Sequence, residues 1–185
     1  MIYPQRISRL VPAKAGKRVG AQVVSPMSVV DYVTMGESRS ATPPKLESRR
    51  GYWLIKTEPH VWSWEDQVKQ EITSWEGVRN YQASNNLKAM VVGDLAFFYH
   101  SGDERQIMGI VEVVKPYYPD PSDPSGRFGM VDVKAVSTLS CPVTLEEVKK
   151  DSRLQHLALV RQSRLSVMPI DEGAWKVLLQ MGKSA

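Results

Sequence analysis

The chain has 185 residues, and its 24 lysines and arginines against 20 acidic residues give a net charge of +4 at pH 7. A domain takes roughly 150 residues, so we expect one domain and about fifty further residues. The lone cysteine, Cys141, excludes an internal disulfide framework and is expected to be a small buried hydrophobe. No apolar run approaches the roughly eighteen residues of a membrane-spanning helix.

Capping residues and runs of β-branched and aromatic residues divide the chain into predicted elements. In chain order we expect a strand at 52–56, helices at 63–70 and 79–90, strands at 94–100 and 107–115, a loop at 117–128, a strand at 130–136, a helix at 144–150, short strands at 157–160 and 165–168, and a helix at 173–181. Strands in hairpins with short helices at the edges predict an α+β fold with a curled, partly closed sheet.

The basic excess belongs to one segment. Residues 1–50 carry nine basic and three acidic side chains, a net of +6, whereas residues 51–185 carry fifteen and seventeen, a net of −2. All five tryptophans also lie after residue 50. We therefore expect residues 1–50 to be a disordered basic leader or a start-site extension, with a transit peptide as the alternative. Residues 51–185 are expected to form the domain.

The usual motifs of catalysis and metal binding are missing from the sequence. It contains no GxGxxG, no phosphate loop, no HExxH and no GxSxG, and its three histidines and one cysteine lack metal-ligand spacing. We therefore expect no cofactor and no metal.

Three clusters that mix polar and aromatic side chains lie near the ends of predicted strands, at residues 56–59, 74–82 and 99–101. A flipped or single-stranded base needs such a mixture, because a ring stacks on it while donors and acceptors pair with its edge. A structural role is the alternative for each cluster. Trp75 fits a core position, Thr57 and Ser101 fit strand-end caps, Arg79 fits a surface ion pair, and His100 fits a hydrogen-bonded histidine at a barrel rim.

At these clusters the sequence resembles the EVE domain family. The matching segments are YWLIKTEP (52–59), WEGVRNYQASNNLKAM (75–90), VGDLAFFYHS (92–101), GIVEVV (109–114), MVDV (130–133) and RQSRLSVMPI (161–170). The resemblance implies a PUA-like fold, a bent β-barrel-like mixed sheet with peripheral short helices, and kinship with YTH and ASCH domains. It also implies a cofactor-free reader of modified cytosine or another modified base in DNA or RNA.

The chain departs from the family pattern at three positions. Thr57 replaces the usual Ser, Glu76 the usual Asp after the tryptophan, and Ser84 the usual Arg. The threonine methyl would narrow a pocket, and the missing arginine removes one phosphate contact.

The leading hypothesis is therefore a non-enzymatic module that reads a modified nucleobase. By position, Trp75 is the counterpart of the cage tryptophan of YTH-like readers and would stack on the base. Its neighbours in the proposed pocket are Thr57, Glu58, Glu76, Arg79, Asn80, Tyr99, His100 and Ser101. Phosphate contacts are expected from Lys56, Arg79, Arg161 and Arg164. A domain with a net charge of −2 should bind with only a modest salt dependence, and Trp75→Ala is expected to abolish binding while preserving the fold.

Two other functions are consistent with the sequence. One is an enzyme acting on a nucleobase, with Glu58 or Glu76 and His100 as acid–base groups. The other is a protein-interaction adaptor, which would need an exposed apolar patch. If the chain is a module that reads a modified nucleobase, we expect its partner to be DNA or RNA that carries such a base. We also expect a monomer in the cytoplasm that does not associate with a membrane. The location would be nuclear or organellar if the leader is a targeting segment.

Overall fold

The computed structural model describes residues 50–183, so the leader predicted for residues 1–50 lies outside the described residues, Arg50 excepted. The strands are β1 (Tyr52–Thr57), β2 (Ile72–Ser74), β3 (Leu95–His100), β4 (Gln106–Pro119), β5 (Gly129–Thr144) and β6 (Val167–Pro169). The helices are α1 (Trp64–Gln70), α2 (Tyr81–Ala89), α3 (Leu145–Lys150), the 3₁₀ turn η1 (Ser152–Leu154), α4 (Ala158–Arg161) and α5 (Glu172–Met181).

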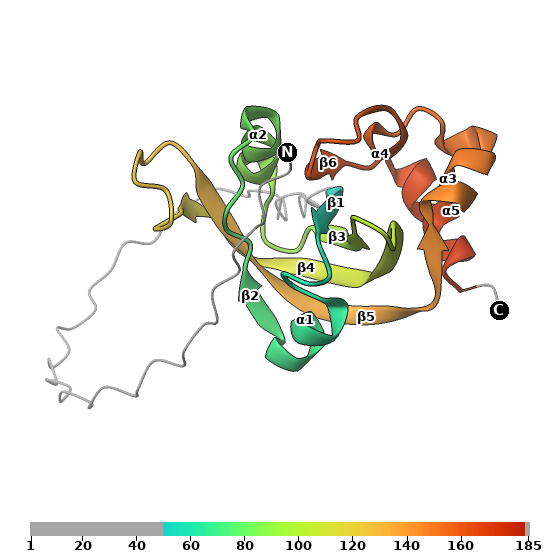
Figure 1. The fold of residues 1–185 in the computed structure, drawn as a ribbon, viewed down its shortest axis with the longest axis horizontal. Helices are drawn as coiled ribbons and strands as arrows, with labels where there is room; N and C mark the ends of the chain where they lie inside the picture. Colours follow the sequence, from blue (N-terminus) through green and yellow to red (C-terminus); the bar gives the residue numbers. More distant parts are fainter. Residues whose placement is uncertain (1–49, 184–185) are drawn as a thin grey trace, which may run out of the picture. The chain divides into compact units, whose positions relative to one another are not determined.

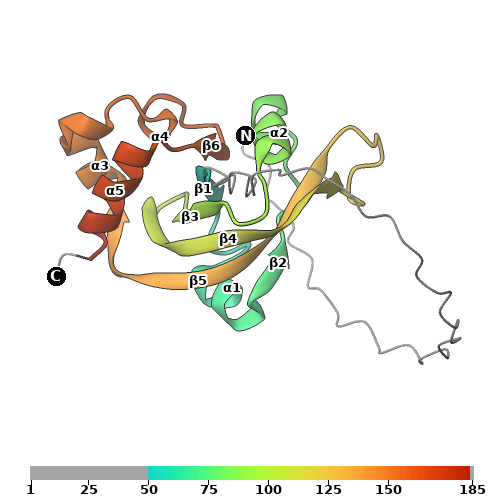
Figure 2. The same ribbon diagram turned by 180° about the vertical axis from the view of Figure 1, so that it is seen from behind.

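The six strands form one open mixed sheet in the order β2-β5-β4-β3-β1-β6. β1 and β3 pair in parallel, and all other neighbours are antiparallel. The β4–β5 register shifts at four places, and such irregularities bend and twist a strand pair. Figures 1 and 2 show the result: β4 and β5 form a long curved ribbon, with α3, α4 and α5 gathered near one end and a projecting loop at the other. The predicted α+β class is confirmed, and the sheet is bent but not closed.

Alternation along β3 assigns the two faces of the sheet. Phe98 packs edge-on against Trp64 of α1, with ring centroids 5.2 Å apart. Phe97, the preceding residue, lies 4.0 Å from the ring of Trp175 in α5. Successive side chains of a strand point to opposite faces, so α1 covers one face, called here the α1 face, and α5 covers the other, called the α5 face.

Local capping explains where three of the helices begin. Ser63 and Asp66 form the predicted capping box at the start of α1, and Thr144 forms a second one with Glu147 at α3. Asp171 caps α5 by accepting from Ala174 N–H at 2.9 Å. No helix among residues 50–183 is long and apolar enough to span a membrane.

Several predicted elements differ from the structure. The strand predicted at 130–136 continues as β5 to Thr144. Residues 157–160 are mostly helical (α4) rather than a strand, because a short apolar run does not distinguish the two. The loop predicted at 117–128 begins only after Pro119, because Tyr117 to Pro119 continue β4, in which Tyr118 and Pro119 pair with β5. The three-residue edge strand β2 is too short to leave a sequence pattern. Cys141 is only partly buried and its thiol is free.

Candidate functional site

The first and third predicted clusters meet because β1 and β3 are parallel and end together, with Thr57 beside His100 in the register. The Thr57 carbonyl accepts from both the backbone N–H of Ser101, at 2.7 Å, and its hydroxyl, at 3.0 Å. The side chains of Thr57 and Ser101 are buried. Both residues thus take the strand-end role that was the structural alternative, at the edge of the α1 face.

Trp75 joins the same face from the segment between β2 and α2. Its ring lies edge-on to Phe98, with centroids 5.6 Å apart, and its backbone N–H donates to the Val131 carbonyl at 2.7 Å. The side chain is fully buried, so neither ring face is open to solvent. Its indole Nε1 has no hydrogen-bond partner among the described residues. Buried polar groups are rarely left unmatched; among the described residues the hydroxyl of Thr73, two residues earlier in β2, is the other such group.

Two predicted residues lie on the other face. Lys56 and Tyr99 pair across β1 and β3, and the Lys56 Nζ lies 5.9 Å from the Tyr99 ring centroid. Both side chains are buried on the α5 face. The structure therefore does not bring Tyr99 or Lys56 together with Trp75, because one position along a strand reverses the direction of the side chain.

Lys56 is not placed as an open phosphate ligand. Its Nζ donates to the Ser163 carbonyl at 2.7 Å, and burial lowers the pKa of Lys56 from 10.5 to about 8. The other two predicted phosphate contacts, Arg161 and Arg164, are exposed. The Nε of Arg161 donates to the Gln155 carbonyl at 2.9 Å.

His100 is held by hydrogen bonds at both ring nitrogens. Nε2 accepts from the Trp64 backbone N–H at 3.0 Å, and Nδ1 lies 2.6 Å from Glu104 Oε2. The hydrogen bond from His100 lowers the pKa of the Glu104 carboxyl. With Nε2 as acceptor, Nδ1 carries the proton, so the ring has no free nitrogen with which to exchange a proton with a substrate. This geometry matches the structural alternative for His100, a hydrogen-bonded histidine at the rim of the sheet.

The remaining residues of the predicted base site also interact with other groups of the protein. Asn80 caps α2 by accepting from Ala83 N–H at 3.0 Å, and its own side chain is therefore turned to the helix. Glu58 lies 3.3 Å from the exposed His60. Glu76 is buried and interacts within the domain.

Asp120 is a residue that the sequence analysis missed, and it organises the segment after Trp75. Its buried carboxylate accepts from Gly77 N–H at 2.9 Å and from Arg79 Nη1 at 2.8 Å, and also from Ser122. Burial alone would raise the pKa of Asp120, but the hydrogen bonds from Ser122, Gly77 and Arg79 outweigh it and hold the pKa below its usual value. Arg79 is thus an ion-pair partner, and it lies 41 residues from Asp120 in the chain.

A second missed group lies beside Trp75. Tyr118 donates its hydroxyl to Asp132 Oδ1 at 2.5 Å and lies 3.1 Å from the Ser74 hydroxyl. Burial and the contact with Asp132 raise the pKa of Tyr118 to about 12. Lys115 Nζ lies 3.5 Å from the ring centroid of Tyr118. No local pattern indicated this group, because its members come from β2, β4 and β5.

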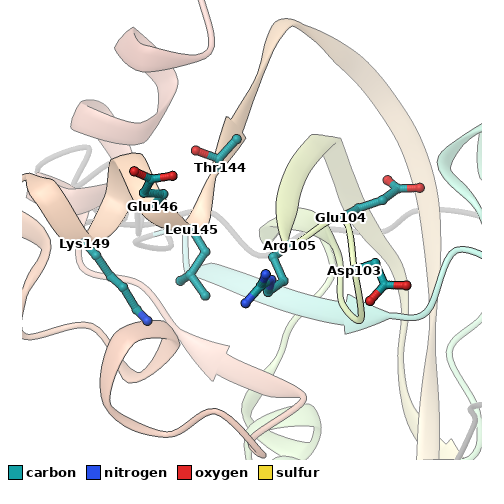
Figure 3. A pocket seen from close by; sticks show the side chains of 7 residues that line it. All are labelled: Asp103, Glu104, Arg105, Thr144, Leu145, Glu146 and Lys149. Atoms are coloured by element: carbon teal, nitrogen blue, oxygen red, sulfur yellow. The ribbon is translucent and has the colours of Figure 1, made fainter.

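A separate pocket of about 370 Å³ lies between the β3–β4 turn and the start of α3. Figure 3 shows its lining side chains, Asp103, Glu104, Arg105, Thr144, Leu145, Glu146 and Lys149. None is aromatic and none belongs to the predicted base site, so this pocket is not a base-stacking pocket. Within residues 50–183, no group of three or more histidine, cysteine or acidic side chains could hold a metal ion.

The bent open sheet with peripheral helices places the protein in the PUA-like α+β class. Residues 51–181 match the EVE domain, and the chain belongs to that family. Human thymocyte nuclear protein 1 is 33% identical over 179 residues, which cover 78% of this chain and 80% of the relative.

Solved structures agree with this assignment. A protein from Rhodopseudomonas palustris, solved by NMR, is 48% identical, covers 71% of this chain and 92% of its own, and superposes with a TM-score of 0.68. A crystal structure of human THYN1 in complex with DNA containing 5-methylcytosine is 34% identical, covers 74% of this chain and 99% of its own, and gives a TM-score of 0.69.

Proposed function

We propose that this chain is a non-enzymatic nucleic-acid-binding domain that reads a modified nucleobase, with 5-methylcytosine in DNA as the first ligand to test. The observation that carries the proposal is the similarity over 99% of the human THYN1 chain that was crystallised with 5-methylcytosine-containing DNA. The unpartnered indole Nε1 of Trp75 supports the location, because a base inserted beside it would supply the missing acceptor.

Base access to Trp75 requires a rearrangement of its surroundings. The ring is fully enclosed and the segment that carries it is tied to Asp120 through Gly77 and Arg79. Opening this segment is the step that we assign to ligand binding, and it costs part of the binding free energy. Exposed arginines such as Arg161 and Arg164 remain proposed phosphate contacts.

The test compares 12-nucleotide DNAs of one sequence that contain either cytosine or 5-methylcytosine at a single position, with binding to the full chain followed by fluorescence anisotropy. We expect tighter binding of the modified strand. Equal affinity for the two strands would refute the proposal. Mass spectrometry of the recovered oligonucleotides, expected to be unchanged, tests the non-enzymatic part, and a new product would favour the enzyme.

The structure changes the choice of variant at Trp75. Trp75→Ala would empty a fully buried site, and we expect a loss of about 3–5 kcal/mol in unfolding free energy rather than an intact fold. Trp75→Phe keeps a ring against Phe98 and removes the indole N–H. We expect it to fold and to lose selectivity for the modified base. Retained selectivity in a folded Trp75→Phe would exclude a role for this N–H.

A further inference from the structure

A group of two rings and two guanidinium groups, partly exposed to solvent, lies at the start of α2 and the end of the 120–128 loop. We call Arg79, Tyr81, Arg127 and Phe128 the aromatic platform. Tyr81 is 64% exposed, although it is a large aromatic residue. Its ring centroid lies 5.2 Å from that of Phe128, and the Arg79 guanidinium lies 5.7 Å from the Phe128 ring. Arg127 Nη1 donates to the Tyr81 hydroxyl at 3.5 Å.

The loop that carries Phe128 and Arg127 is fixed from within. Asp123 accepts from the backbone N–H groups of Ser125, Arg127 and Phe128, at 2.8–3.0 Å, and from the Ser125 hydroxyl at 2.7 Å. The hydrogen bonds from Ser125 and Phe128 lower the pKa of Asp123 to about 2. Asp120 fixes the other side of the platform through Arg79. The platform is therefore preorganised, which reduces the entropy lost when a ligand binds.

The charge of the platform is positive on its outer side. The Asp123 carboxylate is occupied by its own loop, and Asp120 is buried and paired with Arg79. This leaves the exposed Arg127 guanidinium, whose contact with Tyr81 is long, as the outward charge. An open tyrosine ring flanked by a cation suits an unpaired nucleobase and its phosphate, because every base has a face that stacks.

The platform lies close to the proposed base site along the chain. Tyr81 follows Trp75 by six positions, so their Cα atoms are at most about 22 Å apart. That distance is roughly six stacked nucleotides of one strand. One short strand can therefore reach both places.

We propose that the aromatic platform is a second contact site for the same nucleic acid, in which an unpaired base outside the modified-base pocket stacks on Tyr81 while Arg127 holds its phosphate. This inference rests on the proposed function. It predicts a contribution to affinity that is independent of base modification, because stacking on an open ring does not read the edge of a base.

The test uses the full chain and the same pair of single-stranded 12-nucleotide DNAs, with Tyr81→Leu as the main variant. Leucine keeps apolar bulk but has no ring face, and we expect about 5- to 150-fold weaker binding of both strands, with the ratio between them unchanged. Tyr81→Phe keeps the ring and should bind within about twofold of the wild type. Arg127→Ala should reduce the slope of log affinity against log salt by about 0.7.

Val92→Ala is the matched control, because Val92 is 59% exposed and lies outside the platform. All variants are expected to have the melting temperature of the wild type, since the exposed Tyr81 contributes little to the core. Unchanged affinity of Tyr81→Leu for both strands would overturn the platform. A loss confined to the modified strand would also overturn it, since that would place Tyr81 in the reading pocket.

The outcomes separate this inference from the proposed function. If the wild type binds both strands equally and Tyr81→Leu weakens both, the reader proposal fails and the platform stands. If the wild type prefers the modified strand and Tyr81→Leu changes nothing, the platform fails and the reader proposal stands.

Discussion

Replacing Asp120 by alanine tests whether one buried carboxylate holds the segment between β2 and α2. The Asp120 side chain accepts four hydrogen bonds, from Gly77 N, Arg79 Nη1, and the backbone and hydroxyl of Ser122, at 2.6–2.9 Å. Alanine removes all four acceptor contacts. The Arg79 side chain, which is 28% exposed, is left without its buried partner.

The expected loss follows from these contacts. Hydrogen bonds to a charged group contribute about 1.5–3 kcal/mol each, and breaking a buried ion pair costs about 3–5 kcal/mol. Because Arg79 and Ser122 can form hydrogen bonds with water in the variant, we expect a loss at the lower end of the ion-pair range, about 3 kcal/mol of unfolding free energy. For about 130 folded residues the unfolding entropy is roughly 0.28 kcal/mol/K, so Tm should fall by about 10 °C.

The assay is thermal unfolding followed by circular dichroism, with Asp103→Ala as the control. Asp103 is an exposed aspartate in the β3–β4 turn, and its replacement should change the stability by no more than about 0.5 kcal/mol. The pKa of Asp120 is lowered by folding, so its contribution is present above its unfolded pKa of about 3.9 and is lost as the pH falls through the folded value. A Tm change of Asp120→Ala no larger than that of Asp103→Ala would refute the reasoning.

Two further predictions concern the faces of the sheet. Because burial lowers the pKa of Lys56 to about 8, the native state releases this proton before the unfolded state does, and stability should rise between pH 8 and 10.5. Urea unfolding at a series of pH values should show that Lys56→Met lacks this rise in unfolding free energy. If the unfolding free energies of wild type and variant changed in parallel with pH, the burial of Lys56 would be contradicted. Gly109→Ala would place a Cβ 2.2 Å from the Trp64 ring, and we expect a loss of about 1–3 kcal/mol or more. An unchanged urea midpoint for Gly109→Ala would show that Trp64 does not pack there.

The sequence determined the features that depend on neighbouring residues. Ser63, Thr144 and Asp171 marked helix starts because a cap bonds only two or three residues ahead. The pattern of strands and short helices predicted the α+β class, and the motifs YWLIKTEP and GVRNYQ identified the EVE family, before any contact was known. The charge difference between residues 1–50, at +6, and residues 51–185, at −2, also required only counting.

Only the tertiary structure decided how the clustered residues are distributed. A strand of unknown register does not reveal which of Lys56 and Thr57 faces Trp75, and the pairing of β1 with β3 placed them on opposite faces. For Trp75 the resemblance implied a cage wall and a core residue was the structural alternative, and the tertiary structure buries its side chain fully. Asp120 and Phe128 lie more than forty residues from the partners that give them their roles, Arg79 and Tyr81. Local patterns specify the elements, whereas contacts between distant segments specify the surface that a ligand meets.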